Sequence, residues 1–446
     1  LPFPPWLFIW AACLTLAVSF FAVAAASHTS RLQREGWRPA QSRLARLAES
    51  KPAAIVARAL GLLLLAWVIA DGIIGDEPPY RSFAVTFTFV TVWIGLPVAA
   101  ATLGDHFAAF DPWRTLARAA GRLSSRVGAR RRRLRYPERL GRWPAAAAVL
   151  AFVWAEVVLG SDLSHQEVTA GTVAAAAGAY SLYTLTMMSL FGARAWSSNG
   201  ELFSVYARMF GSLSPFSWRD GRLGRRRALT GPPSWGRVPG SDAVALAAIA
   251  GTTYDGAQQG VLASLRRSLT GAIADLGAGS PWDAWLVDTS LLVGTVVLIA
   301  AVYLLGILGM RRIPGSPSVS RLRLAFSHTL IPIALAYLVA HYFSYFAERI
   351  QAQLTFLISD PLGTGADLLG LAGYEVETGI FSTLAVWTIQ MISLVGGHIL
   401  GLVLAHDRSV SLWTQPRLAA RSQYWMLIVM MALTSLGLFL LSVTNS

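Results

Sequence analysis

The chain has 446 residues, of which 54% are hydrophobic and only 14% are charged, and its formal net charge is +13. In soluble domains roughly a quarter of all residues are charged. The low charged fraction of this chain therefore excludes one large soluble core and indicates many membrane spans. Cys13 is the single cysteine, which excludes a disulfide framework and a cysteine-based metal cage.

The chain begins with an apolar run that is long enough to cross a membrane. Its first 26 residues hold no basic segment, and their apolar stretch has the length of a span and exceeds that of a signal-peptide core. We therefore expect the first span here, without a cleavable signal.

Apolar runs recur along the rest of the chain at the length that a helix needs to cross a bilayer. The sequence predicts ten spans, at about 6–26, 53–74, 82–103, 144–160, 169–193, 239–256, 284–309, 324–346, 379–405 and 423–442. The fourth is short, and the sixth is the weakest because its apolar stretch ends in polar residues.

Basic residues alternate between the segments that join these spans. With the N-terminus outside, 33 of the 37 Arg and Lys residues fall on the cytoplasmic side and four on the other. Such a split is typical of the positive-inside rule. We predict an all-α, polytopic helix bundle of about ten transmembrane helices in the bacterial plasma membrane. It forms one domain, 1–446, with both termini outside.

The connecting segments also have predicted roles. Residues 104–143 form a basic cytoplasmic loop, which we expect to contact anionic lipids, and residues 194–238 form a second cytoplasmic loop. Residues 257–283 read as an outer amphipathic segment with Arg266 and Arg267 on its polar face, and 347–378 as a structured outer loop. The basic loop lacks the interleaved aromatic residues of nucleic-acid binders, so no nucleic-acid partner is expected.

Several phrases resemble a known family. They are "AFDPWR", "YPERLGRWPAA", "FSHTLIPIALAYLVAHYFS", "ISDPLG", "GHILGLVLAHDRSV" and "RSQYWMLIVMMALTSLGLFLL". The chain resembles polytopic membrane proteins of actinobacteria and related bacteria, whose members are sometimes labelled fenitrothion hydrolase. The resemblance covers nearly the whole chain, and its label implies hydrolysis of organophosphate-like esters.

Histidines near the eighth and ninth spans are candidate ligands of copper or haem iron. His328, His398 and His406 fall in the cytoplasmic half, where adjacent antiparallel helices would bring them together as a cofactor-binding group. His341 falls near the outer surface, about 140° around the helix from His328, so one face does not present both. The alternative is that each ring hydrogen-bonds a neighbouring helix.

A second group combines His341 with carboxylates. Glu156 lies inside the fourth span and Asp255 ends the sixth, and with His341 they form a candidate metal site. Asp71, Asp162, His165 and Glu348 are expected nearby in an outward-facing polar pocket. The alternative is that these groups are interfacial helix ends.

The sequence leaves several functions open. We expect a membrane protein that binds metal or haem and takes part in redox chemistry or metal handling, including as a subunit of a larger complex. The alternatives are a proton-coupled transporter or channel, the membrane hydrolase implied by the resemblance, and an accessory structural subunit. The sequence contains no Walker loop and no GxSxG motif.

Overall fold

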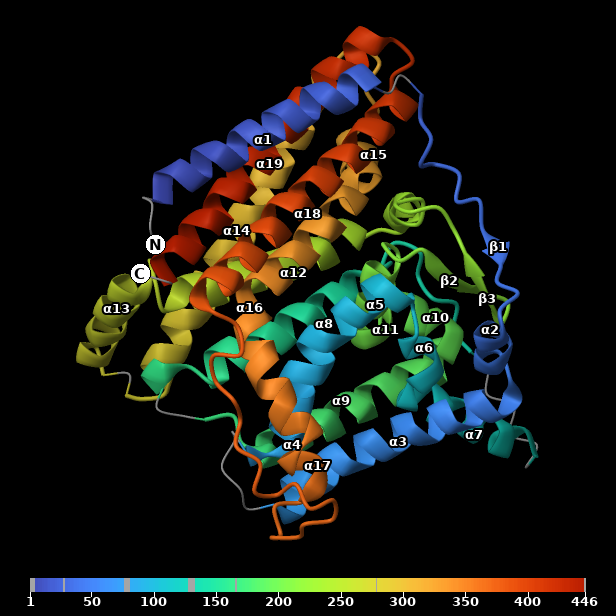
Figure 1. Ribbon diagram of the computed structural model, residues 1–446, viewed down its shortest axis with the longest axis vertical. Coiled ribbons are helices and arrows are strands. Elements are labelled where there is room, and N and C mark those ends of the chain that lie inside the picture. Colours follow the sequence, from blue (N-terminus) through green and yellow to red (C-terminus); the bar gives the residue numbers. More distant parts are fainter. Residues whose placement is uncertain are drawn as a thin grey trace.

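The computed structural model describes residues 5–26, 29–75, 81–126, 133–164, 167–277 and 279–444. It is a bundle of helices with one small sheet at its edge (Figure 1). The predicted all-α architecture is therefore confirmed for the apolar helices. The strands of the sheet lie in segments that connect helices.

The first half of the chain supplies the following helices. They are α1 (Pro5–Ala26), α2 (Arg43–Ala48), α3 (Lys51–Ile74), α4 (Phe83–Thr86), η2 (Phe87–Gly95), α5 (Leu96–Leu103), α6 (Phe107–Phe110), α7 (Pro112–Arg126), α8 (Trp143–Trp154), η3 (Ala155–Leu159), η4 (Asp162–Ser164), α9 (Ala170–Phe191), α10 (Ala193–Asn199) and α11 (Leu202–Gly211).

The second half contains the longest helices. They are η5 (Pro232–Arg237), α12 (Ser241–Gln258), α13 (Ala263–Asp275), α14 (Trp282–Arg311), α15 (Val319–Phe326), η6 (Ser327–Leu330), α16 (Ile331–Leu354), α17 (Phe356–Ser359), α18 (Thr383–Leu412) and α19 (Pro416–Thr444).

All ten predicted spans lie on helices of this bundle. Seven helical segments are long and apolar enough to cross a membrane, which makes the chain a multi-pass membrane protein by length and composition. The first and fourth predicted spans appear as shorter apolar stretches, Ile9–Ala22 and Trp143–Leu159.

The sixth predicted span, α12, forms the centre of the bundle. It packs against α8, α14 and α16, and all its residues are buried except Ala243 and Asp255, which are partly exposed. A helix enclosed by protein does not need a lipid-facing apolar surface, so its weak hydropathy reflects its position. Small residues allow the close packing, since a Cβ on Gly251 would lie 2.7 Å from Val153.

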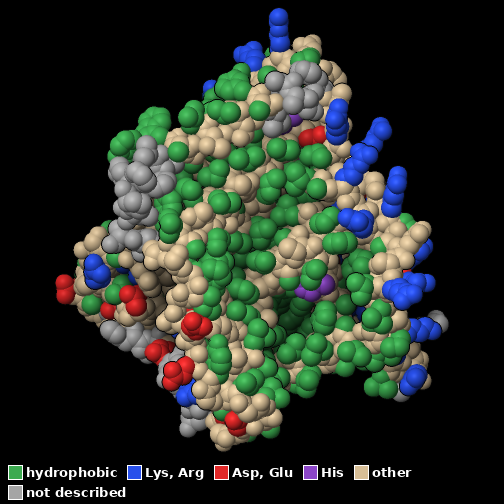
Figure 2. Space-filling model, in the orientation of Figure 1, with side chains coloured by type: hydrophobic (Ala, Val, Ile, Leu, Met, Phe, Trp, Pro, Cys, Tyr) green, Lys and Arg blue, Asp and Glu red, His purple; other side chains and the backbone are tan. Residues whose placement is uncertain are grey.

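Charged side chains divide between two edges of the bundle. Figure 2 shows Arg and Lys side chains along the edge that holds the strands and α2, and most acidic side chains in view at the opposite edge. The start of α1 and the end of α19 lie away from the basic edge, near α13 (Figure 1). This separation matches the charge alternation of the sequence.

A three-stranded antiparallel sheet joins two of the basic-edge segments. Its strands are β1 (Arg38–Pro39), β2 (Phe216–Arg219) and β3 (Arg222–Arg225), in the order β1-β3-β2. Asp220 and Gly221 connect β2 to β3 with φ values of 49° and 78°, as the two-residue turn of a hairpin requires. The sequence analysis missed this Asp-Gly signal.

Helices α16 and α18 approach closely through two glycines of α18. A Cβ on Gly397 would lie 2.3 Å from Ala336 Cβ, and one on Gly401 would lie 2.9 Å from the Thr329 carbonyl oxygen. Small residues four positions apart permit such contact between membrane helices. The neighbouring Gly396 has nothing within 4 Å of its virtual Cβ.

We predict that Gly397→Ala destabilises the protein by about 1–3 kcal/mol, because the new methyl group must displace α16 backbone. Gly396→Ala is the matched control and should leave stability unchanged or raise it slightly, since alanine favours the helix. Thermal unfolding in detergent measures both. Equal unfolding temperatures for the two variants would contradict the close contact.

Arg266 was predicted on the solvated face of an amphipathic helix, α13, and this prediction is wrong. Its side chain is buried, and its Nε donates to Asp288 Oδ1 at 2.7 Å while Nη2 donates to Asp162 Oδ1 at 3.0 Å. Tyr254 donates to the same Asp288 oxygen at 2.8 Å, so the charge pair links α13, α14 and α12. Helical periodicity indicates which residues share a face, but it does not identify what that face contacts.

Removing one member of a buried ion pair leaves the other uncompensated, at a cost of about 3–5 kcal/mol. We therefore expect Arg266→Ala to lower the unfolding temperature strongly. Its neighbour Arg267 is exposed, so Arg267→Ala should change stability by less than about 0.5 kcal/mol. A similar small effect of both substitutions would show that the pair does not hold α13 in place.

Candidate functional site

Asp255 and His341 form a direct pair inside the bundle. Asp255 lies near the end of α12, and its Oδ2 is 2.9 Å from Nε2 of His341 on α16. The Tyr342 hydroxyl donates to the same oxygen at 2.6 Å, and Gln258 Nε2 donates to Oδ1 at 2.6 Å. The structure thus brings together two of the three residues that the sequence grouped as a metal site.

Both members of the pair are partly accessible. The side chain of His341 is 23% exposed and that of Asp255 is 18% exposed, although almost every other residue of α12 is buried. Asp255 of the pair is therefore a partly exposed side chain on an otherwise mostly buried helix.

Glu156 is the third predicted residue of this group. It lies in η3, close enough to Asp255 for their charges to interact, but no hydrogen bond joins it to Asp255 or His341 in the described residues. Its Oε2 is buried and has no hydrogen-bond partner there. The three side chains thus share one electrostatic environment without forming a closed ligand set.

Aromatic residues complete this group, which we call the Asp255–His341 cluster: Trp93, Glu156, Tyr206, Asp255, His341 and Tyr342. The rings of Trp93 and Tyr206 stack with centroids 4.9 Å apart, and both lie beside the polar residues. The sequence analysis missed these aromatics, because they come from separate segments and share no spacing.

Two π-helical segments supply residues of the cluster. Trp93 lies in η2 and Glu156 lies in η3, whose backbones depart from regular α-helical hydrogen bonding. Segments of this kind are uncommon and often accompany functional sites, because they redirect side chains from the regular helix face. Both turn toward the same pair, which favours a functional reading of the cluster.

The helix that carries His341 is longer than the eighth predicted span. The eighth predicted span ends at residue 346, but α16 continues to Leu354. His341 is therefore 13 residues, or about 20 Å, from the end of this helix. Glu348 and Arg349 follow the predicted end of this span and belong to the same helix.

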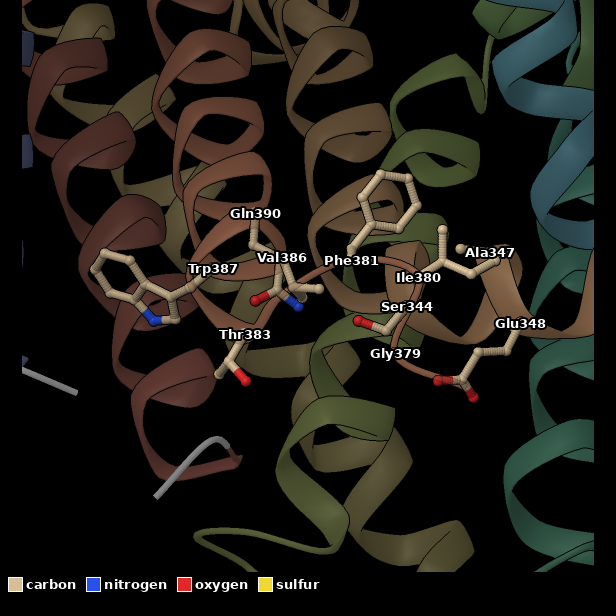
Figure 3. A pocket seen from close by; sticks show the side chains of 10 residues that line it. All are labelled: Ser344, Ala347, Glu348, Gly379, Ile380, Phe381, Thr383, Val386, Trp387 and Gln390. Atoms are coloured by element: carbon tan, nitrogen blue, oxygen red, sulfur yellow. The ribbon is translucent and has the colours of Figure 1, made fainter. Parts of the chain in front are cut away.

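A pocket of about 220 Å³ lies between α16 and α18, beyond His341 (Figure 3). Ser344 and Glu348 line it from α16, and Thr383 and Trp387 line it from α18. His341, Ser344 and Glu348 fall on one face of α16, because they are spaced by three and four residues. The pocket and the histidine thus occupy neighbouring turns of one helix face.

The described residues contain no group of three or more His, Cys, Asp or Glu side chains placed to hold a metal ion. In the Asp255–His341 cluster, His341 Nε2 is already engaged by Asp255. This arrangement does not support the three-residue metal site predicted from Glu156, Asp255 and His341.

His328 and His398 are both fully buried between α16 and α18, but at different levels. The His328 ring lies beside the backbone of Leu404, whereas the His398 ring lies 6.0 Å from that of Tyr337. His398 Nδ1 contacts the Leu394 carbonyl oxygen at 2.8 Å, and Nε2 has no partner in the described residues. Gly397 and Gly401 bring α18 into close contact with α16 and with the residues before it near these rings.

His406 and Asp407 have structural partners at the basic edge. His406 Nδ1 lies 2.8 Å from Gln423 Oε1 on α19. Asp407 accepts hydrogen bonds from the backbone of Arg31 and Leu32 at 2.6 and 2.9 Å, and from Gln33 Nε2 at 2.6 Å. Asp407 thus fixes the segment after α1 onto α18, which the sequence analysis missed.

The other predicted outer residues are dispersed. Asp71 accepts hydrogen bonds from Ser82 and Ala84 and so holds the start of α4, and Asp162 pairs with Arg266. Glu348 lines the pocket between α16 and α18. His165 lies outside the described residues.

A second buried polar cluster lies toward the basic edge. Glu201 is fully buried and accepts hydrogen bonds from Ser204 N at 2.7 Å and from the Tyr180 hydroxyl at 2.8 Å. Asp111 accepts a hydrogen bond from the Ser204 hydroxyl at 3.2 Å. Burial, together with the nearby charge of Asp111, raises the pKa of Glu201 to about 7.

This raised pKa predicts a pH dependence. Between the ordinary pKa of 4.5 and about 7, the folded state binds more protons at Glu201 than the unfolded state, so stability falls as pH rises. The fall totals up to about 3 kcal/mol. Unfolding temperatures at pH 5 to 8 should decline less for Glu201→Gln than for the wild type. Parallel declines would contradict the assignment.

Comparison with protein-family models, curated proteins and solved structures finds no match to this chain. The functional argument therefore rests on the geometry of the clusters.

Proposed function

We propose that this chain is a proton-coupled transporter or channel of the bacterial plasma membrane, and that the Asp255–His341 cluster carries the proton. The observation that carries the proposal is the partly exposed Asp255–His341 pair beside the unpartnered Glu156, within the helix bundle.

Ionisable groups inside a membrane protein lie away from bulk water. A carboxylate inside a membrane helix costs at least about 2.5 kcal/mol, so such groups are retained chiefly where they pair, line water or move protons. Two carboxylates beside one imidazole change their total charge when a single proton arrives. Protonation of the cluster therefore alters the forces between η3, α12 and α16, which is the coupling that a transporter needs.

The access route supports the same function. The pocket between α16 and α18 lies one turn along α16 from His341, and it presents hydroxyl, carboxylate and aromatic side chains (Figure 3). A small solute entering this pocket would lie beside the proton-carrying residues. The concentration of Arg and Lys at one edge of the bundle favours an orientation in which this basic edge faces the cytoplasm and both chain ends lie outside.

We expect proton flux in liposomes that contain the purified protein, measured with an internal pH dye under an imposed gradient. Asp255→Asn, His341→Gln and Glu156→Gln should each reduce the flux at least about tenfold, because each removes a titrating group from the route. Glu375→Gln, in an exposed loop away from the cluster, is the matched control and should keep wild-type flux.

Elemental analysis and a visible spectrum of the same preparations separate this function from metal or haem chemistry. Stoichiometric copper or iron that is lost in His341→Gln, together with flux unaffected by Asp255→Asn, would overturn the transporter and favour a redox protein. Flux that requires the cluster in metal-free, colourless protein supports the transporter.

A further inference from the structure

A second and larger pocket, of about 510 Å³, lies at the basic edge of the bundle. It is enclosed by the segment after α1, by η5, by α15 and by the end of α18. Its walls include four arginines, Arg219, Arg237, Arg321 and Arg408, and one carboxylate, Glu35. This volume is in the range of small-molecule sites in proteins.

The walls of this pocket are held by specific contacts. Asp407 binds residues 31–33, which places Glu35 at the rim. Arg408 Nη2 donates to the Pro233 carbonyl oxygen at 2.9 Å, which fixes η5 against α18. The pocket is thus built from segments far apart in sequence and is fixed before any ligand arrives.

The one carboxylate that lines the pocket, Glu35, already forms ion pairs with arginines. Glu35 pairs with Arg219 and, at 2.9 Å, with Arg226 behind the wall. Glu35 therefore does not neutralise the other three arginines of the pocket. Asp407 attracts the Arg408 charge more strongly than Arg237 repels it, and its oxygens also accept hydrogen bonds from the segment after α1.

The other three arginines of the pocket have positive charge and hydrogen-bond donors that an anion could bind. Arg408 Nε is buried and has no hydrogen-bond partner in the described residues, and Arg237 lies close enough to repel the Arg408 charge. Arg237 and Arg321 are exposed at the opening of the pocket. An anion between these three side chains would satisfy the buried donor and remove the repulsion.

We propose that this pocket binds a phosphate group, either of a soluble phosphate or of an acidic phospholipid headgroup. Guanidinium groups present paired donors that match phosphate oxygens, and several of them around one cavity favour a doubly charged or ester-linked phosphate over a monovalent halide. The pocket is distinct from the Asp255–His341 cluster and does not depend on the transport function.

The test uses the full chain in a sugar-headgroup detergent, which contains no phosphate. In one arm, inorganic phosphate is titrated against chloride at equal ionic strength by calorimetry. In the other, phosphatidylglycerol is added to the micelles, and bound lipid is counted by native mass spectrometry. We compare wild type with Arg237→Gln/Arg321→Gln and with Arg43→Gln, an exposed arginine of α2 outside the pocket.

We expect saturable binding near one site per chain in at least one arm, weakened about tenfold in the double variant and unchanged in Arg43→Gln. Binding in the phosphate arm alone assigns a soluble ligand, and in the lipid arm alone a phospholipid headgroup. The same affinity in the double variant and in Arg43→Gln, or no saturable binding in either arm, would overturn the proposal. The single Arg321→Gln variant replaces the double variant if the latter unfolds.

Discussion

The enclosure of α12 by other helices is the constraint on which the rest of the bundle depends. A helix that faces lipid must present apolar side chains, whereas one that faces only protein can carry Ser, Thr and Asp. The neighbours of α12 replace lipid on every side, and their small residues bring them close. This arrangement places Asp255 against α16 while leaving its side chain partly exposed.

The same enclosure explains where regular helical geometry fails. Both π-helical segments, η2 and η3, provide residues beside the end of α12, where Trp93 and Glu156 must fit around a charged pair. An inserted residue changes the direction of side chains that follow it. Val90, Trp93 and Ile94 of η2 and Val157 and Val158 of η3 are buried against the rest of the bundle.

The sequence predicted what depends on composition and period. Apolar length located the helices, and the alternation of arginines separated the two edges, because both properties are local or additive along the chain. The grouping of His341 with Asp255 followed from matching depths in neighbouring spans.

The sequence could not predict which side chains, far apart in the chain, contact one another in the folded protein. Arg266 has the same pattern as Arg267, and only its neighbours Asp288 and Asp162 make one buried and the other exposed. The rings of Trp93 and Tyr206 come from segments more than a hundred residues apart, so no spacing predicts their stacking. The sequence also does not give the positions of His328 and His398 relative to each other along the helix axes. The expectation that they meet rested on their approximate depths alone.

The attachment of residues 31–33 to Asp407 has a consequence for the order of synthesis. The segment after α1 finds its hydrogen-bond acceptor in a helix made some 370 residues later, and α1 itself packs against α18 and α19. During translation α1 is therefore made long before α18 and α19, and it stays in the membrane without these neighbours until they are synthesised. The segment after α1 reaches its native place late, and a chain that lacks α18 would leave it unanchored.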